Sequence, residues 1–214
     1  MLFRDRRDAA RALAGALAAW RGANPLVLAI PRGAVPMGAE LAEALQGELD
    51  VVLVRKLGSR WSPEYAIGAL DESGRVVITD QDEADADWLA CEKARKLERL
   101  AERRALYSPA RRAVDPAGRV VIVVDDGLAT GATMIAALDT VRARGPARLI
   151  CAVPVASATS LERVRPHADE VVCLHAPHDF SAVGQFYRRF DQVEDDEVVA
   201  LLAAHQAEGR PAAC

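Results

Sequence analysis

The run of residues 120–134, V-V-I-V-V-D-D-G-L-A-T-G-A-T-M, constrains the fold of this chain more than any other stretch. It begins with five β-branched apolar residues, passes through the adjacent carboxylates Asp125 and Asp126, and continues in a loop of small residues before a helix-like stretch. A short, wholly apolar segment is typical of a strand that is buried on both faces of a parallel sheet. The run therefore predicts a buried strand, a tight turn and the start of a helix.

The turn after this strand has the chemistry of a binding site for a phosphorylated sugar. The backbone N–H groups of residues 129–133 would lie at a helix N-terminus, where they lack intrahelical partners and attract anions. Gly127 and Gly131 allow the backbone to approach a ligand closely. The two carboxylates would repel a phosphate, but they accept hydrogen bonds from sugar hydroxyls. One ligand that suits both features is a 5-phosphorylated ribose.

The same run resembles the signature of the type I phosphoribosyltransferases, which bind 5-phosphoribosyl 1-pyrophosphate. The family motif has about four apolar residues, two acids, two mostly apolar residues and a loop of the form A/D-T-G-x-T, and residues 121–133 match it position by position. The resemblance implies that Asp125 and Asp126 bind the ribose hydroxyls, and that Asp125 binds Mg²⁺ directly or through water. It assigns the 5-phosphate to Ala129, Thr130, Gly131, Ala132 and Thr133. A generic strand–turn–helix crossover is the alternative interpretation.

A second loop, I-P-R-G-A at residues 30–34, follows the first predicted strand. Gly33 permits unusual backbone angles, and Arg32 places a permanent forked cation at the end of the strand. The family binds pyrophosphate on a short basic loop with a glycine at this location. The resemblance therefore assigns pyrophosphate to Arg32, Gly33 and the Ala34 amide, whereas a plain turn with a surface arginine is the alternative.

A third loop is expected at residues 57–65, after a strand that ends in Arg55 and Lys56. The family closes a mobile loop over the site, and closure would exclude water that hydrolyses a ribosyl cation. Lys56 would then place positive charge beside the departing pyrophosphate, and Glu64 is a candidate general base. An exposed turn with solvated cations is the alternative.

Apolar runs and helical patterns alternate along the chain, which predicts an α/β fold with a doubly wound, mainly parallel sheet flanked by helices. We expect one domain over residues 1–207, with a mobile loop, strand pair and helical insertion at 57–115, a possible hood at 175–194 and a frayed tail at 208–214. The expected strands are 26–30, 51–54, 120–124, 149–155 and 170–174, and the expected helices are 5–19, 36–45, 157–165 and 195–207. Ligands bind at the carboxyl ends of the strands in such sheets.

The expected helix at residues 83–107 is acidic at its start and basic towards its end, an arrangement that the helix dipole favours. A solvated helix explains this pattern, and an RNA-contacting face is the alternative. After the last expected strand, Phe180, Phe186, Tyr187 and Phe190 could form a stacking wall for a flat base, a part of the core or a dimer contact. The nearby His175, His178 and Asp179 predict a loop rather than a metal site, because Pro177 interrupts helical spacing.

Length and charge favour a soluble enzyme. No apolar stretch reaches the ~20 residues that a membrane helix needs, and the net charge of −4 argues against a dedicated nucleic-acid binder. The four cysteines form no C-x-x-C pair, which favours free thiols in a reducing compartment. We therefore expect a cytoplasmic homodimer whose partners are 5-phosphoribosyl 1-pyrophosphate and a small acceptor, with no membrane partner and nucleic acid disfavoured.

The resemblance is strongest to small stand-alone bacterial phosphoribosyltransferases of undefined substrate. Members that use hypoxanthine or guanine carry an aspartate before T-G-x-T, and this chain has Ala129 there. The expected activity is therefore Mg²⁺-dependent transfer of phosphoribose to a nitrogen nucleophile, a nucleobase of another type. A non-catalytic sensor of 5-phosphoribosyl 1-pyrophosphate, or an RNA-binding regulator, is the alternative. No G-x-S-x-G, H-E-x-x-H or Walker motif supports a hydrolase.

Overall fold

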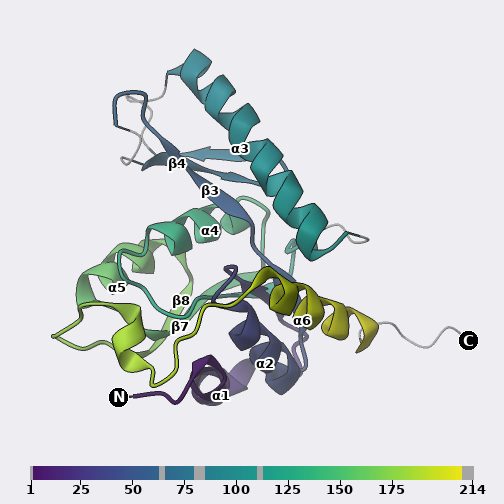
Figure 1. Ribbon diagram of the computed structural model, residues 1–214, viewed down its shortest axis with the longest axis vertical. Coiled ribbons are helices and arrows are strands. Elements are labelled where there is room, and N and C mark those ends of the chain that lie inside the picture. The colour runs from purple at the N-terminus through teal and green to yellow at the C-terminus, as the bar shows by residue number, and fades with distance from the viewer. Residues whose placement is uncertain (1, 63–65, 80–84, 110–112, 209–214) are drawn as a thin grey trace, which may run out of the picture.

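The computed structural model describes residues 2–62, 66–79, 85–109 and 113–208. Its centre is a five-stranded sheet in the order β2-β1-β6-β7-β8, in which every neighbouring pair is parallel (Figure 1). The strands are β1 (Leu26–Ala29), β2 (Glu48–Val51), β6 (Val120–Val124), β7 (Arg148–Val155) and β8 (Glu170–His175). The predicted doubly wound α/β sheet is therefore confirmed.

Successive residues of the central strands face opposite layers, as strand geometry requires. Val27 and Ile122 pack in a core with α1 (Arg6–Ala16), α2 (Val35–Leu45) and α6 (Asp195–Glu208). Leu28 and Val123 pack in a second core with α4 (Ala132–Arg142) and α5 (Ala158–Val164). Figure 1 shows these two helical layers on either side of the sheet. Burial on both faces explains why β1 and β6 contain only apolar residues.

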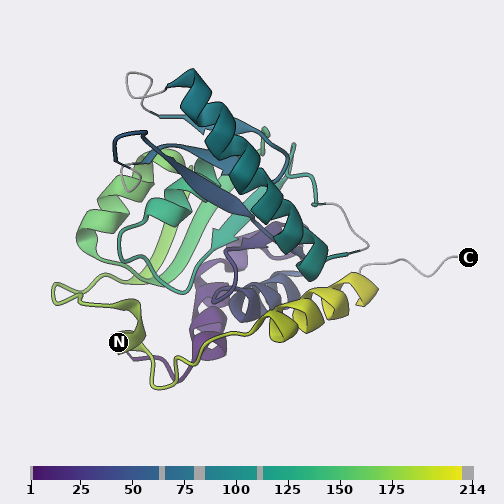
Figure 2. The ribbon, with the colours of Figure 1, turned by 45° about the horizontal axis from the view of Figure 1, so that its top comes forward.

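A second sheet stands above the first, as Figure 2 shows, with α3 (Ala86–Tyr107) lying across it. It is antiparallel, in the order β3-β4-β5, with β3 (Val54–Gly58), β4 (Ala66–Asp71) and β5 (Val76–Ile78). The predicted strand pair is β4 and β5, joined by a turn at residues 71–74, and Asp85 caps the predicted long helix at its N-terminus. We call this part, residues 54–107, the upper lobe.

The expected single strand at 51–54 is wrong, because two strands meet there. β2 ends at Val51, which pairs with Ala29, the last residue of β1. The last bond to β1 runs from the Val52 N–H to the Ala29 carbonyl at 3.0 Å, and beyond Ala29 the chain of β1 turns into the loop at 30–34. The chain then enters β3, which pairs with β4. Arg55 and Lys56 consequently lie inside a strand of the upper lobe rather than at the end of a core strand.

A buried arginine fastens the upper lobe to the central sheet. Arg104 of α3 donates to Asp50 of β2 at 2.7 Å and to both carboxylate oxygens of Glu72 at 2.5 Å. It also donates to the carbonyl oxygen of Val51 at 3.0 Å. The second oxygen of Asp50 accepts from the backbone N–H of Val114 at 2.8 Å. Every charged group of this junction thus has a partner, which is what burial of charge requires.

Residues 3–6 lie against the segment 186–191, although the two are far apart in sequence. The backbone N–H of Phe3 donates to Phe186 at 2.8 Å, and the N–H of Arg188 donates back to Phe3 at 2.9 Å. The rings of Phe3 and Tyr187 lie 5.7 Å apart, and both side chains are buried. The possible hood at 175–194 therefore packs on the start of α1. No described helix is long and apolar enough to span a bilayer.

Candidate functional site

The two carboxylates of the signature stand where β6 ends, and they have different surroundings. Oδ2 of Asp126 accepts a hydrogen bond from Nε of Arg6 at 2.9 Å, and it forms an ion pair with Nη2 of the same guanidinium, also at 2.9 Å. Asp125 has no ion pair with any residue that the structure describes, and its Oδ1 accepts from the Asp126 backbone N–H at 2.9 Å. One acid is therefore paired, and the other keeps a free carboxylate oxygen.

The pKa of Asp125 is raised well above its ordinary value, chiefly because burial disfavours the charged form and secondly because the Asp126 carboxylate is adjacent. Burial also raises the pKa of Asp126, although the Arg6 guanidinium opposes that shift. Two neighbouring half-buried acids with raised pKa values are typical of a functional site, since structure alone gains nothing from this arrangement. Hydroxyl donors or a cation would relieve the repulsion.

Arg6 is the site residue that sequence analysis missed. Its side chain is only 12% exposed, because it is surrounded by the hood: the guanidinium lies 3.9 Å from the Phe190 ring centroid and donates to the Asp191 carbonyl at 2.7 Å. The Tyr187 hydroxyl donates to the backbone carbonyl of Asp126 at 2.7 Å. The predicted helix at 5–19 includes Arg6, but nothing in the sequence connects this helix with a strand that ends about 120 residues later.

The loop at 30–34 lies beside the signature, as predicted. A Cβ atom added to Gly33 would stand 2.4 Å from Oδ2 of Asp126, so only glycine allows this approach. Ala34 is buried and precedes the first residue of α2. The Arg32 guanidinium is 31% exposed and lies 3.6 Å from Glu194 and 3.8 Å from Asp195 at the start of α6. Arg32 is thus held loosely and can turn to an anion.

The expected anion cradle, residues 129–133, forms the turn into α4. Gly131 is the N-cap in the left-handed conformation at φ 74° and has no side chain to cap the helix, and Thr130 Oγ1 makes only a long contact of 3.5 Å with the Ala132 N–H. The first N–H groups of α4 therefore lack intrahelical partners. The Ala129 carbonyl accepts from Ser160 Oγ at 2.6 Å and Ser157 Oγ at 3.3 Å. These bonds hold the outer side of the loop to α5, while Thr130 and Thr133 remain exposed.

A cavity of about 220 Å³ opens between the central sheet and the upper lobe. Arg32 and Thr133, from two of the predicted loops, both line it, together with Arg55, Arg103 and Tyr107. The predicted loops therefore converge at the carboxyl ends of β1 and β6.

Lys56 does not line this cavity; its exposed side chain alternates with that of Arg55 along β3, and its carbonyl accepts from Lys96 Nζ at 2.6 Å. The role expected for Lys56 stays a prediction. Glu64 lies outside the described residues, as does part of the expected mobile loop.

The aromatic residues of the hood serve mainly as core. Phe186 and Tyr187 are buried, and Phe180 packs on Phe186 with ring centroids 5.5 Å apart. Phe190 stacks on Tyr187 at 4.9 Å and is 36% exposed, with Arg6 over its ring. Of the alternatives for this cluster, packing fits the first three residues, so that a base could meet only Phe190.

No group of three or more His, Cys, Asp or Glu side chains within the described ranges could form a protein-only metal cage. Proteins usually bind Mg²⁺ with one or two carboxylates, while substrate phosphates and water supply the other ligands. The free oxygen of Asp125 suits that mode.

Known proteins resemble this chain over nearly all of its length. Residues 5–190 match the family model of the phosphoribosyl transferase domain. In each of two strains of Mycobacterium tuberculosis, a protein with the name "Putative phosphoribosyl transferase" is 45% identical over 208 residues. That match covers 94% of this chain and 46% of the relative, so the chain spans about half the length of the curated relatives it matches.

Two solved structures share the fold. The crystal structure of the protein TT1426 from Thermus thermophilus is 47% identical with a TM-score of 0.90, and the match covers 95% of this chain and 99% of that one. A hypothetical protein from Neisseria gonorrhoeae, solved with bound ppGpp, has a TM-score of 0.50 at 15% identity, over 95% and 98% of the two chains. The second likeness concerns the fold alone.

Proposed function

Because the chain belongs to the phosphoribosyl transferase domain family, we propose that it transfers phosphoribose from 5-phosphoribosyl 1-pyrophosphate to a nitrogen nucleophile. The observation that carries this proposal is the approach of Gly33 to Asp126, which brings a basic loop against a ribose-type carboxylate. An exposed anion cradle at residues 129–133 follows in the same turn. A ligand with phosphate, ribose and pyrophosphate groups in this order would contact the cradle, the carboxylate and the basic loop respectively.

In the proposed reaction the bond from the anomeric carbon to the pyrophosphate oxygen breaks, and a bond to the acceptor nitrogen forms. Positive charge develops on the ribose, and negative charge develops on the leaving oxygen. Asp125 and Asp126 would orient the ribose hydroxyls and stabilise the positive charge, while Arg32 would stabilise the pyrophosphate. The cradle would act as a remote anchor that fixes the reacting geometry.

We propose Mg²⁺ as the cofactor, held by the Asp125 carboxylate directly or through water. It would neutralise charge on the leaving group. The chain's own residues would do the rest: Arg6 keeps Asp126 in place, the Asp126 N–H orients Asp125, and α5 steadies the cradle through Ser157 and Ser160.

For the acceptor, we propose a nucleobase other than hypoxanthine or guanine. Ala129 has no titratable group, and its carbonyl already accepts from two serines. Loss of a positioned proton-transfer group typically lowers a rate by ~10²–10⁴-fold. Oxopurines that need such a group should therefore be poor substrates.

The test is a screen of adenine, hypoxanthine, guanine, xanthine, uracil and orotate with 5-phosphoribosyl 1-pyrophosphate and Mg²⁺, with pyrophosphate release as the readout. The Asp125→Asn/Asp126→Asn double variant is the control, which should release none. Turnover of hypoxanthine or guanine alone would contradict the argument from Ala129. Tight binding without turnover of any base would favour the sensor instead.

A further inference from the structure

A second cavity adjoins the first, and no residue of the signature run 120–134 lines it. Its volume is about 360 Å³, and its lining is mainly polar, from β3, the last turns of α3 and the start of α6. Arg55 and Arg103 line both cavities, which places the two side by side. We call the second cavity the arginine groove; its lining residues are Arg55, Arg99, Glu102, Arg103, Leu106 and Asp195.

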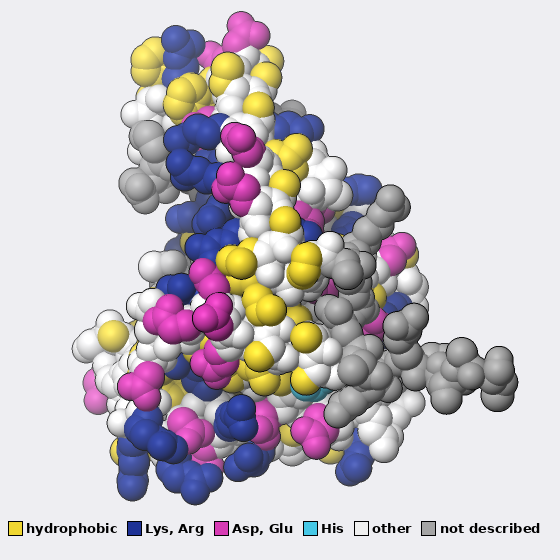
Figure 3. All heavy atoms as spheres, turned by 45° about the vertical axis from the view of Figure 1, so that its right-hand side comes forward, with side chains coloured by type: hydrophobic (Ala, Val, Ile, Leu, Met, Phe, Trp, Pro, Cys, Tyr) yellow, Lys and Arg dark blue, Asp and Glu magenta, His cyan; other side chains and the backbone are white. Residues whose placement is uncertain are grey.

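The arginine groove holds more positive charge than its neighbours neutralise. Arg103 pairs with Asp195 at 2.8 Å, and no side chain in the described part of the chain forms an ion pair with Arg55 or Arg99. Figure 3 shows Lys and Arg side chains gathered beside α3, above a group of acidic side chains. Charged surface residues usually intersperse both signs, so two unpaired guanidinium groups on one cavity are suggestive of an anionic ligand.

The helix spacing strengthens this argument. Arg99 and Arg103 are four residues apart on α3, and like charges at this spacing lie on one face and destabilise a helix slightly. Arg55 reaches the same cavity from a different element, β3. Guanidinium groups that converge from two elements match the several oxygens of a phosphate, which can accept forked hydrogen bonds from each.

The acids in the lining select for a multiply charged ligand. The Asp195 carboxylate already accepts from Arg103 and from the Tyr107 hydroxyl, each at 2.8 Å, and Glu102 adds a second negative charge. A monoanion would gain little from displacing Asp195, whereas a phosphate dianion offers more charge and more acceptors.

We propose that the arginine groove is a second anion site, separate from the cradle at 129–133, which binds a phosphate group through Arg55, Arg99 and Arg103. The shared chemistry is that of a phosphate dianion, whether it comes as free phosphate or as a small phosphate monoester. This proposal does not depend on the transfer reaction, and it gives the upper lobe a binding role of its own.

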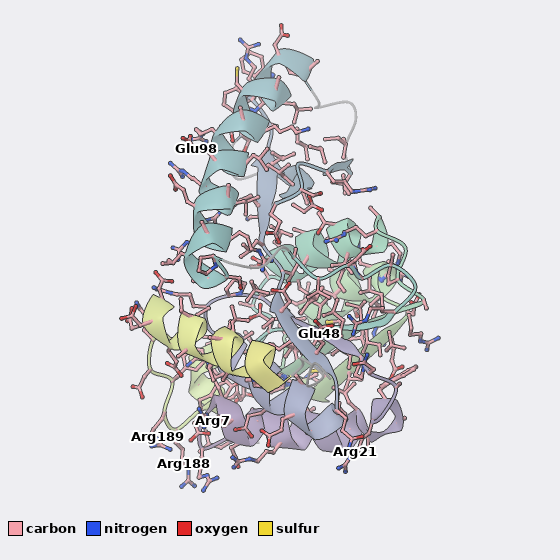
Figure 4. All side chains as sticks on the ribbon, turned by 90° about the vertical axis from the view of Figure 1, so that its right-hand side faces the viewer. Arg7, Arg21, Glu48, Glu98, Arg188 and Arg189 are labelled. Carbon is pink, nitrogen blue, oxygen red and sulfur yellow. The ribbon has the colours of Figure 1, made fainter. Side chains whose placement is uncertain are left out.

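The test is isothermal titration calorimetry with inorganic phosphate and, separately, with glycerol 3-phosphate. Saturating 5-phosphoribosyl 1-pyrophosphate and Mg²⁺ fill the transfer site, so that any remaining phosphate binding belongs elsewhere. Arg99→Ala should weaken that binding on the order of 10-fold, because one charge-assisted partner is lost. Arg21→Ala, an equal change of charge at the far end of the molecule (Figure 4), should leave it unchanged.

A second pair of variants moves affinity in the opposite direction. Glu102→Gln should tighten phosphate binding several-fold, because it removes a repelling charge from the lining. Glu98→Gln, on an exposed part of the same helix that does not line the groove (Figure 4), should change it less. Both side chains lie at the surface, so the folded state should persist, as a thermal melt would verify.

The ligand that binds more tightly identifies the source of the phosphate. The proposal is overturned if neither phosphate nor glycerol 3-phosphate binds. It is also overturned if the Arg99→Ala and Arg21→Ala variants bind phosphate with equal affinity. If 5-phosphoribosyl 1-pyrophosphate itself fails to bind, the proposed function fails, but the same variants can still be compared on the free protein.

Discussion

Two clusters of acidic side chains in this molecule each contact an arginine, but only one of the two clusters has all of its charges paired. Beneath the upper lobe, Asp50 and Glu72 share Arg104, and all three are satisfied. At the end of β6, Arg6 serves Asp126 alone, and Asp125 keeps a raised pKa and a free oxygen. The first cluster joins two parts of the fold, whereas the second is incomplete until something else arrives. Pairing of charge thus separates a structural junction from a binding site.

The largest loss of stability should follow from removal of Arg104, the arginine of the fully paired cluster. Arg104→Ala leaves Asp50 and Glu72 buried without their partner, which should lower the free energy of unfolding by about 3–5 kcal/mol. Urea denaturation measures this loss. Arg95→Ala serves as the control, because its own side chain is largely exposed and its pair with Glu92 contributes about 0–1 kcal/mol. A loss below about 1 kcal/mol for Arg104→Ala, the range of an exposed pair, would show that the junction is not held by charge.

A smaller loss is expected at the incomplete cluster. Arg6→Ala removes a charge-assisted hydrogen bond and an ion pair to Oδ2 of Asp126, together worth about 1.5–3 kcal/mol. Arg6→Lys should recover only part of this stability, because an ammonium cannot bring two nitrogens of one planar group against Oδ2. Arg7→Ala is the control in the denaturation experiment, because Arg7 is exposed (Figure 4) and lies 3.9 Å from its acidic neighbour Glu40. If Arg6→Ala is no less stable than Arg7→Ala, then Arg6 does not support the site.

Asp125→Asn should change stability and ligand binding in opposite directions. The pKa of the Asp125 carboxyl is raised in the folded protein above its unfolded value of about 3.9. This carboxyl therefore stabilises the fold fully only below the unfolded pKa, and its contribution is lost as the pH rises through the folded pKa. At neutral pH the charge on Asp125 is therefore unfavourable, and the asparagine, which still accepts from Asp126, should raise the free energy of unfolding.

The same variant should bind 5-phosphoribosyl 1-pyrophosphate about 10–100-fold more weakly, since one charged acceptor is lost. Denaturation on either side of the unfolded pKa, at about pH 3 and about pH 7, measures the stability effect, and calorimetry measures the affinity. Unchanged affinity would remove the ribose-binding assignment, and a stability gain that does not shrink towards low pH would contradict the pKa argument.

The smallest effect on stability is expected at Arg32, whose acidic neighbours Glu194 and Asp195 lie 3.6 Å and 3.8 Å away and are accessible to solvent. Arg32→Ala should change the free energy of unfolding by less than about 1 kcal/mol. The same variant should nevertheless weaken the binding of pyrophosphate on the order of 10-fold, while the binding of ribose 5-phosphate stays nearly unaffected. Equal losses for both ligands in calorimetry would mean that Arg32 is structural.

Sequence analysis predicted the central sheet because its signals are local: β1 and β6 are continuous apolar runs, and glycines mark the loops after them. It failed at 51–54, because four apolar residues fit one buried strand as well as the join of two. It also missed Arg6, since an ion pair between residues 120 positions apart leaves no periodicity. The arrangement of the predicted loops needed the topology, because only the strand order makes β1 and β6 neighbours.

The contact between residues 3–6 and 186–191 has a consequence for how the protein is made. Arg6 reaches the Asp191 carbonyl across 185 residues, so the first helix must wait for nearly the whole chain before Asp126 is fixed in place. At the usual ~5–20 residues per second, a ribosome needs roughly 10–40 s to cover that interval. The acids at the end of β6 are themselves synthesised 65 residues before Asp191, and until Asp191 follows they would lie exposed to water, since no hood covers them. The transfer site should therefore be among the last parts to become native, long after β1 and β2 have been synthesised.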